Sequence, residues 1–431
     1  MRHGIKRRHF LKGAGVAGTA LVAGCLGGDD GGNGGNGGGN GSGGNGSGGG
    51  GGGGGELSVG VLMPLTGDLG TLGQPIANGA ELPVTQLESA DTSYTINSQT
   101  EDTATDPNQG VTAAESLVNA GFPAVTGAAS SAVTIQVANQ VFVPEGVAMC
   151  SPASTSPDIT DLEDEGLVYR TPPADNIQGP VLAQVAADEG ASTASTIFVN
   201  NDYGQLLSET FSEAFESEQD GTVQQTVSLQ PGQSSYSSQL QQALGDDPDL
   251  LLVIAYPESG IQLFRDFYSG FDTDLPVLVT DGLRDGTLPT EVGNEMANVQ
   301  GTAPSADGPG RDFFTQRWEE EYDGSPGVFT AQAYDATAVL LLAQAAAGEA
   351  DGAAIAEQMQ TVANPEGEEF TPDQLGDALE AAGAGDEINY QGASSSLEFD
   401  DNGDLQTAVY ELFAFNPDGG IETVETIEFD G

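Results

Sequence analysis

The chain has 431 residues, of which 65 are Asp or Glu and only 10 are Lys or Arg, so its formal net charge is −55. Such a charge repels phosphates, which excludes nucleic acid as a natural partner. The only histidines, His3 and His9, and the only lysines, Lys6 and Lys12, lie near the N-terminus. The rest of the chain therefore cannot hold a Ser-His-Asp triad, a zinc–histidine site, a P-loop or a Schiff-base lysine.

Residues 1–24 have the pattern of an export signal. Arg7 and Arg8 precede an apolar stretch too short to span a bilayer, and small residues lead to Cys25. This order resembles a twin-arginine signal that ends in a lipobox, so we expect lipid on Cys25 and a place on the outer face of the cytoplasmic membrane. Residues 25–55 would be the lipidated Cys and a Gly-rich tether with too little apolar surface to fold.

The charge balance after the signal is more extreme still. Five Arg then remain against 65 acids, a net charge of about −60. Molar salt shortens the repulsion between such charges to a few Å. The composition resembles that of haloarchaeal proteins.

From residue 56 onward, short apolar runs alternate with longer helical stretches. Strands are expected first at 56–65, 94–102, 122–128 and 147–153, and helices at 73–90, 106–121 and 130–146. This alternation predicts a parallel sheet with right-handed crossovers.

The alternation restarts near residue 192 and indicates a second lobe, as expected for a region too long for one core. Its strands are expected at 192–202, 223–229, 249–257 and 275–282, with helices at 203–219, 236–248 and 258–270. Two further helices are expected at 311–324 and 327–348. Residues 394–416 read as a β-hairpin with its turn at 400–403.

Several stretches in order resemble the type I solute-binding proteins of ATP-driven (ABC) importers, specifically the branched-chain amino-acid group. They are "VGVLMPLTGDLGTLGQPIANGAEL", "DTATDPNQGVTAAESLV", "TGAASSAV", "VAMCSPASTSPDIT", "VYRTPPADNIQG", "FVNNDYGQ", "QAYDATAVLL" and "GASSSLEFDDNGD".

The resemblance implies an α/β fold of two doubly wound lobes with parallel central sheets, joined by three crossovers and closing on a ligand. The crossovers would be 169–176, 299–307 and the region near 392–397. Lobe one would then comprise 56–172 plus 305–392, and lobe two 174–302 plus 394–431.

The resemblance also implies a ligand site at the carboxyl ends of strands, where helices begin. The carboxylate-binding serine carries over to Ser130, with Ser131 as the one-residue alternative. Ala153, Ser154 and Thr155 match the wall of small residues and threonine. Helix capping alone is the competing interpretation of these hydroxyls.

The second lobe would supply the rest of this site. Asp281 matches an acidic residue, commonly Glu, that binds the ligand ammonium; a plain turn before Gly282 is the alternative. Tyr203 and Tyr256 match aromatic positions lining the cleft. Leu72 stands where the family often has an aromatic, and Arg284 either helps a carboxylate or pairs with Asp285.

The function implied is a lipid-anchored extracellular binding protein that passes a branched-chain or related amino acid to a permease, with ATP hydrolysis on partner chains. No enzyme activity, metal or cofactor is expected. The alternative is a receptor-like sensor for an amide, urea or aromatic acid on the same fold. A secreted carboxylate-based glycosidase is a third class, which screening for turnover would reveal.

Overall fold

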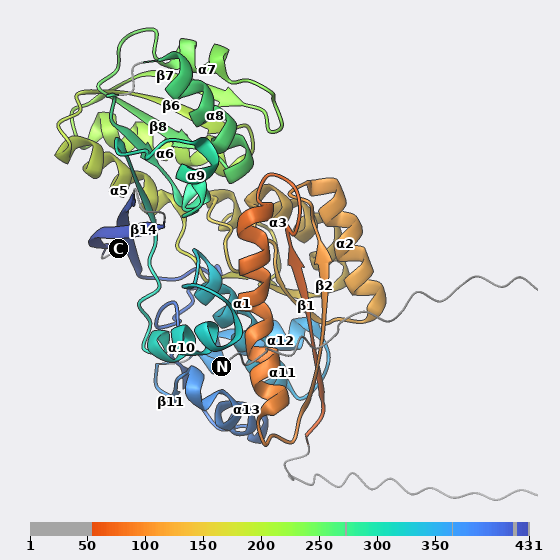
Figure 1. Ribbon diagram of the computed structural model, residues 1–431. Helices are drawn as coiled ribbons and strands as arrows, with labels where there is room; N and C mark the ends of the chain where they lie inside the picture. Colours follow the sequence, from red (N-terminus) through yellow and green to blue (C-terminus); the bar gives the residue numbers. More distant parts are fainter. Residues whose placement is uncertain (1–53, 272–273, 364, 417–419, 430–431) are drawn as a thin grey trace, which may run out of the picture. The chain divides into compact units, whose positions relative to one another are not determined.

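The computed structural model describes residues 54–271, 274–363, 365–416 and 420–429. The predicted signal, Cys25 and nearly all of the tether lie outside these ranges. Within them the chain forms two large sheets, and we call the parts built around them lobe one and lobe two (Figure 1).

Lobe one is built on a five-stranded, fully parallel sheet in the order β2-β1-β3-β4-β5. Its strands are β1 (Glu56–Met63), β2 (Thr95–Asp102), β3 (Ala124–Gly127), β4 (Ala148–Ser151) and β5 (Val168–Arg170). The helices between them are α1 (Gly70–Ser89), α2 (Pro107–Ala120), α3 (Ser131–Val137) and α4 (Val143–Glu145). A π-helical turn at Ala138–Phe142 joins α3 to α4, so the single helix expected at 130–146 is divided.

A later part of the chain completes lobe one. It contains α10 (Arg311–Glu321), α11 (Thr330–Ala347), α12 (Gly352–Val362), α13 (Leu375–Ala384) and a small parallel pair, β11 (Glu368–Phe370) with β12 (Ile388–Tyr390). Helix α11 lies beside α1 although far from it in sequence (Figure 1), and Gln344 Oε1 accepts from the Ser58 backbone N–H at 2.8 Å. Almost every residue of α11 is buried, as is usual for a helix without a distinct polar face.

Lobe two has a seven-stranded sheet in the order β14-β13-β10-β9-β8-β6-β7. Its strands are β6 (Thr193–Val199), β7 (Thr222–Leu229), β8 (Leu250–Ile254), β9 (Val277–Val279), β10 (Val299–Pro304), β13 (Ala408–Phe415) and β14 (Ile421–Phe429). Its helices are α5 (Asp175–Asp188), α6 (Asp202–Ser217), α7 (Ser237–Ala243), α8 (Pro257–Gly270) and α9 (Leu288–Val292). Strands β6 to β10 are parallel, as expected, whereas β13 and β14 add antiparallel strands at one edge.

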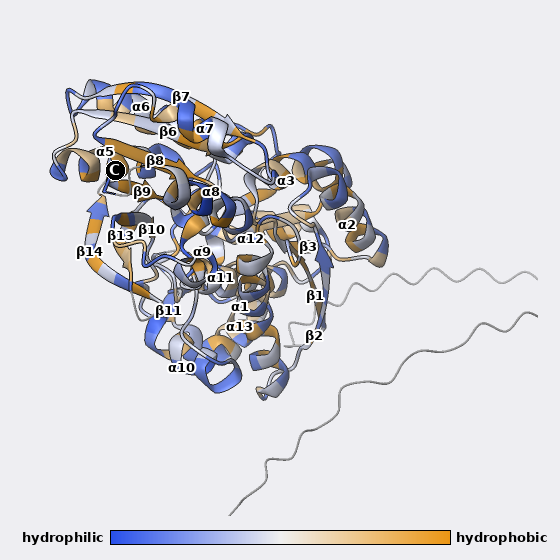
Figure 2. Cartoon of the chain, turned by 45° about the horizontal axis from the view of Figure 1, so that its top comes forward, coloured by the Kyte–Doolittle hydropathy of each residue, from blue (hydrophilic) through white to orange (hydrophobic). Residues whose placement is uncertain are grey.

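The core follows from this layering, since strands covered on both faces become continuous apolar runs. Strand β8, "LLLVI", is completely buried, and Figure 2 shows hydrophobic stretches along the strands between the helices of lobe two. One buried cluster joins both lobes, because Leu72 and Ala153 of lobe one belong to the same cluster as Tyr203 and Tyr256 of lobe two.

The C-terminal region differs from the expected hairpin and from the expected third crossover. Leu397, Phe399 and Leu405 pack in a buried cluster of lobe one, and the chain joins the second sheet only at β13. The "DDNG" stretch forms a tight loop closed by a single Phe399–Leu405 bridge, while the hairpin is β13 with β14. The change of lobe therefore falls after Leu405 rather than near 392–397.

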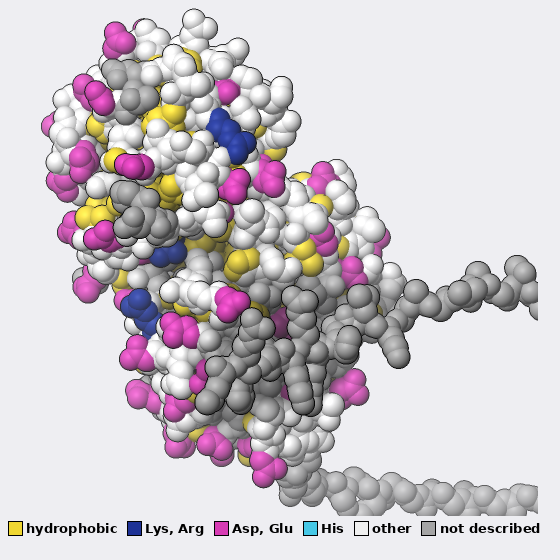
Figure 3. Space-filling model, in the orientation of Figure 1, with side chains coloured by type: hydrophobic (Ala, Val, Ile, Leu, Met, Phe, Trp, Pro, Cys, Tyr) yellow, Lys and Arg dark blue, Asp and Glu magenta, His cyan; other side chains and the backbone are white. Residues whose placement is uncertain are grey.

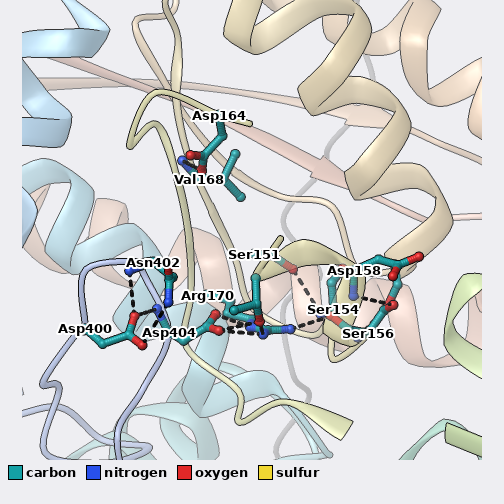
Figure 4. Close-up of polar contacts among 12 residues, drawn as sticks. Ser151, Ser154, Ser156, Asp158, Asp164, Val168, Arg170, Asp400, Asn402 and Asp404 are labelled. Carbon is teal, nitrogen blue, oxygen red and sulfur yellow. Dashed lines mark hydrogen bonds and ion pairs between the residues drawn. The ribbon is translucent and has the colours of Figure 1, made fainter. Parts of the chain in front are cut away.

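The loop at 400–404 has a structural role (Figure 4). Asp400 Oδ1 accepts from the backbone N–H groups of Asn402 and Asp404, at 2.8 and 3.0 Å, which presents the Asp404 carboxylate to Arg170. The Arg170 guanidinium is fully buried and binds both Asp404 oxygens, at 2.5 and 2.8 Å, and the Ser156 carbonyl at 2.8 Å. Arg170 thus fixes the first crossover and also holds the loop that follows β4.

No single helix among the described residues has the length and apolar composition of a membrane span, although the bent pair α11 and α12 meets both criteria together. On the face shown in Figure 3, acidic side chains are spread over the surface and Lys or Arg side chains are few.

Candidate functional site

The two lobes meet around a small cleft lined by residues of both. Its apolar wall consists of Leu69, Leu72, Ile76, Ala129, Ala153 and Phe329. Its polar side is formed by Ser131, Tyr203, Tyr256, Asp281 and the backbone at Gly282. Six of the ten residues proposed from the sequence therefore line one cleft: Leu72, Ser131, Ala153, Tyr203, Tyr256 and Asp281.

Lobe one contributes the turn between β3 and α3. Gly127 has φ +142°, where a side chain would be strained, and an added Cβ would lie 2.4 Å from the Leu62 carbonyl oxygen. This glycine lets the chain turn directly from the strand into Ser130, the residue that precedes α3. The Ser130 hydroxyl makes no capping bond to its own helix and instead lies 3.4 Å from the Tyr256 hydroxyl of lobe two. Helix capping therefore does not account for Ser130.

The wall that follows β4 divides into two kinds of residue. Ala153 lines the cleft, whereas the Ser154 hydroxyl points into lobe one and bonds Thr134 at 2.8 Å and the Ala128 carbonyl at 3.0 Å. Ser154 is thus committed to holding the two turns together. The Thr155 hydroxyl is buried without a hydrogen-bond partner, and its carbonyl accepts from the Asp175 N–H at 2.8 Å. Thr155 does not line the cleft, and its hydroxyl lies close enough to the Asp175 carboxylate to influence it.

Two tyrosines of lobe two form the opposite wall. The rings of Tyr203 and Tyr256 stack with centroids 5.6 Å apart and planes within 6°. The Tyr203 hydroxyl bonds Thr280 at 2.6 Å and lies 3.4 Å from both Asp281 oxygens. Asn201 donates to the Tyr256 hydroxyl at 3.1 Å. Burial raises the pKa of both tyrosines, so they remain neutral hydrogen-bonding groups.

Asp281 is the central charged group of the cleft. It follows β9, opens a short 3-10 turn (Asp281–Leu283), and is 3% exposed. Loss of water raises its pKa to about 6, although hydrogen bonds from Gln178 and Tyr203 act in the opposite direction. No salt bridge to Asp281 is found among the described residues. Within the described part of the chain the carboxylate therefore has no cationic partner, and a buried charge without one is costly.

Sequence reasoning missed a second acid, Asp175, at the start of α5. It is fully buried, and neither of its carboxylate oxygens has a hydrogen-bond partner. Burial raises its pKa strongly, the negative charge of Asp281 adds to the rise, and Thr155 and Arg170 oppose it. The side-chain oxygens of Gln178 and Tyr410 are also buried without partners. None of these residues lines the cleft, and together they form a buried polar region whose charges influence Asp281 and Tyr410.

Some residues of the cleft were not predicted from the sequence, and one predicted residue lies outside it. Phe329, Leu69 and Ile76 line the cleft but were not singled out, and only their apolar character could have suggested them. Arg284 does not line the cleft and pairs with Glu411 of β13, not with Asp285. Among the described residues, no group of three His, Cys, Asp or Glu side chains could hold a metal ion.

Comparison with known proteins agrees with this architecture. The model of the family described as "Periplasmic binding protein" matches residues 56–373. The chemotactic signal transduction system substrate-binding protein BasB of Halobacterium salinarum is 27% identical over 384 residues, covering 86% of this chain and 90% of that protein. Its source agrees with the haloarchaeal origin that the composition predicted.

Two further proteins show the same likeness. The leucine-, isoleucine-, valine-, threonine- and alanine-binding protein of Pseudomonas aeruginosa is 24% identical over 370 residues, covering 84% of this chain and 90% of that protein. The crystal structure of the branched-chain amino acid transporter substrate binding protein LivJ of Streptococcus pneumoniae, solved with isoleucine, superposes with a TM-score of 0.72. It is 18% identical and covers 87% of this chain and 100% of that one. At this identity the superposition shows the fold alone.

Proposed function

The chain belongs to the periplasmic binding protein family, and on that premise we propose that it binds a branched-chain or related amino acid between its lobes and delivers it to an ABC permease. The observation that carries the proposal is the buried, cation-free Asp281 in a cleft whose opposite side is apolar. A zwitterion with a short aliphatic side chain matches both features, since its ammonium replaces the missing cation and its side chain fills the apolar wall.

We assign the ammonium and the carboxylate of such a ligand to different side chains. The ammonium would bind Asp281, and the nearby Asp175 carboxylate, which does not line the cleft, would add negative charge. The ligand carboxylate would accept hydrogen bonds from Ser130 or Ser131, because hydroxyls can hold a carboxylate without a basic side chain.

Hydrophobic packing would select the side chain. Leu72 and Phe329 line the apolar side of the cleft. An aliphatic group there gains free energy in proportion to the apolar surface removed from water.

The proposal extends to location and partners. Lipid on Cys25, after twin-arginine export, would hold the protein at the outer face of the membrane, and the tether at 25–55 would let it reach the permease. Ligand would shift an open-to-closed equilibrium by bridging lobe one and lobe two. The family is one of solute-binding proteins rather than of enzymes, and in this scheme ATP is hydrolysed by partner chains.

Thermal unfolding in multimolar KCl, with a panel of amino acids, amides, urea and aromatic acids, tests the proposal. A ligand at a hundred times its Kd should add about 2.7 kcal/mol of stability. We expect leucine, isoleucine or valine to raise the melting temperature. Stabilisation only by compounds without an ammonium would contradict the role given to Asp281 and favour the amide, urea or aromatic-acid alternative.

A second candidate function is sensing rather than uptake, and similarity to a chemotactic substrate-binding protein supports it. The loaded protein would then present its closed form to a membrane transducer. Deleting the gene separates the two functions, since loss of labelled leucine uptake indicates transport and loss of taxis toward leucine indicates sensing.

A further inference from the structure

We propose that Asp68 acts as a closure latch, a carboxylate of lobe one that caps the N-terminus of helix α8 in lobe two when the cleft is shut. Asp68 lies in the loop between β1 and α1 and does not line the ligand cleft. The inference rests on the proposed function only in taking closure to be driven by a ligand, and it adds a residue that sets affinity without touching that ligand.

The contact is a dense set of hydrogen bonds between distant parts of the chain. Asp68 Oδ1 accepts from the Ser259 backbone N–H at 2.9 Å, and the Ser259 hydroxyl lies 2.8 and 2.7 Å from Oδ1 and Oδ2. The Glu258 backbone N–H also lies 3.4 Å from the Asp68 carbonyl oxygen. The two partners are 191 residues apart and belong to different lobes.

Helix α8 lacks the cap that its own sequence would normally supply. The residue before it, Tyr256, makes no side-chain capping bond. The first N–H groups of a helix need acceptors, and Asp is among the best residues for this task. Asp68 therefore provides from the opposite lobe what an N-cap residue provides locally, and its negative charge meets the positive end of the helix dipole.

The latch is built to release. Burial raises the pKa of Asp68, the Glu258 charge adds to the rise, and the bonds from Ser259 oppose it. Closing thus removes a carboxylate from water at a cost that the hydrogen bonds offset. The loop itself does not depend on the latch, because the Leu69 N–H donates to Thr105 at 3.1 Å within lobe one.

The experiment uses the full-length chain in multimolar KCl, with leucine as the probe. Stopped-flow kinetics should show that Asp68→Ala raises the leucine dissociation rate about tenfold, equivalent to ~1.4 kcal/mol, with the association rate unchanged. Ser259→Ala, which keeps the backbone N–H, should give a smaller rise. The double variant should match Asp68→Ala, because both substitutions remove one interaction.

Two controls separate the latch from general effects. Glu115→Ala removes an exposed charge from α2 and should leave both rates unchanged. The melting temperature of the ligand-free Asp68→Ala variant should fall by less than that of the leucine-bound variant, since only the closed part of the ligand-free population makes the contact. If Asp68→Ala lowered the melting temperature as much without leucine as with it, Asp68 would have a structural role and the latch would be overturned.

The radius of gyration from small-angle X-ray scattering distinguishes failure of the latch from failure of the proposed function, because it needs no ligand. If leucine does not bind the wild type, the proposed function fails, and a larger radius for ligand-free Asp68→Ala still supports the latch. If leucine does not bind, an unchanged radius for Asp68→Ala overturns the latch. If leucine binds, an unchanged radius together with an unchanged dissociation rate overturns it.

Discussion

Replacing Asp281 with Asn should stabilise the ligand-free protein while it abolishes amino-acid binding. The pKa of Asp281 is raised from 3.8 to about 6. Each unit of difference between the pKa values of the folded and unfolded states corresponds to about 1.4 kcal/mol. The ionised Asp281 carboxylate therefore costs on the order of 3 kcal/mol of folding free energy at neutral pH. Asn is nearly isosteric and neutral, so it removes this cost and also relieves the repulsion felt by Asp175.

The sign follows from proton binding. Between about pH 4 and 6 the folded protein binds more protons at Asp281 than the unfolded chain does, so ligand-free stability falls as the pH rises through that window. At pH 7.5 the full cost is present, and Asp281→Asn should raise the melting temperature by about 5 °C. A ligand ammonium compensates the carboxylate, and the same variant should therefore lose its response to leucine.

Differential scanning fluorimetry in molar KCl, with and without leucine, measures both effects. The exposed Glu88→Gln variant removes one negative charge without altering the cleft and should change neither reading. A lower melting temperature for ligand-free Asp281→Asn would refute the electrostatic reasoning. A preserved leucine response would refute the assignment of the ammonium.

Three further outcomes are expected. The leucine-induced rise in melting temperature should shrink below about pH 6, because the ammonium then has to displace a proton from Asp281; scans at pH 5 and 7.5 check this. Asp404→Ala should lower the free energy of unfolding in denaturant titrations by about 3–5 kcal/mol, because it leaves Arg170 buried without its counter-charge, whereas the exposed Asp401→Ala should change it little. Leu72→Ala should weaken leucine binding about tenfold and improve binding of phenylalanine relative to leucine, measured by calorimetry, because it enlarges the apolar side of the cleft.

The fold was largely predictable because its signals are local. A run such as "LLLVI" between two helical stretches is legible from hydrophobic pattern alone, and it forms β8. The expected hairpin at 394–416 was wrong for the opposite reason. "DDNG" does turn the chain, but the strands on either side pair elsewhere, since the Arg170–Asp404 bond holds this loop against lobe one. That bond joins residues 234 apart, and no local pattern reports it.

The site was predictable only where a strand end identified the residue. Tyr256 and Asp281 are each the second residue after a buried strand, so topology alone directs them to the edge where ligands bind in such sheets. Ser154 also follows a strand, yet its hydroxyl turns inward, because the Ala128 carbonyl offers it a buried partner. Position along the chain thus predicts which turn faces the cleft, but not which side chain within that turn does.

Charge makes the remaining acids hard to recognise. In a chain with 65 carboxylates, a single Asp has no compositional signal. What distinguishes Asp175 from the others is that folding removes its water, while Thr155 and Arg170 compensate its charge only in part. Most acids can remain at the surface, where molar salt screens them. Screening by ions does not reach a fully buried carboxylate, so a cationic ligand or a proton has to compensate it. The same excess of acid that obscures Asp175 in the sequence therefore makes its burial the stronger evidence for a functional role.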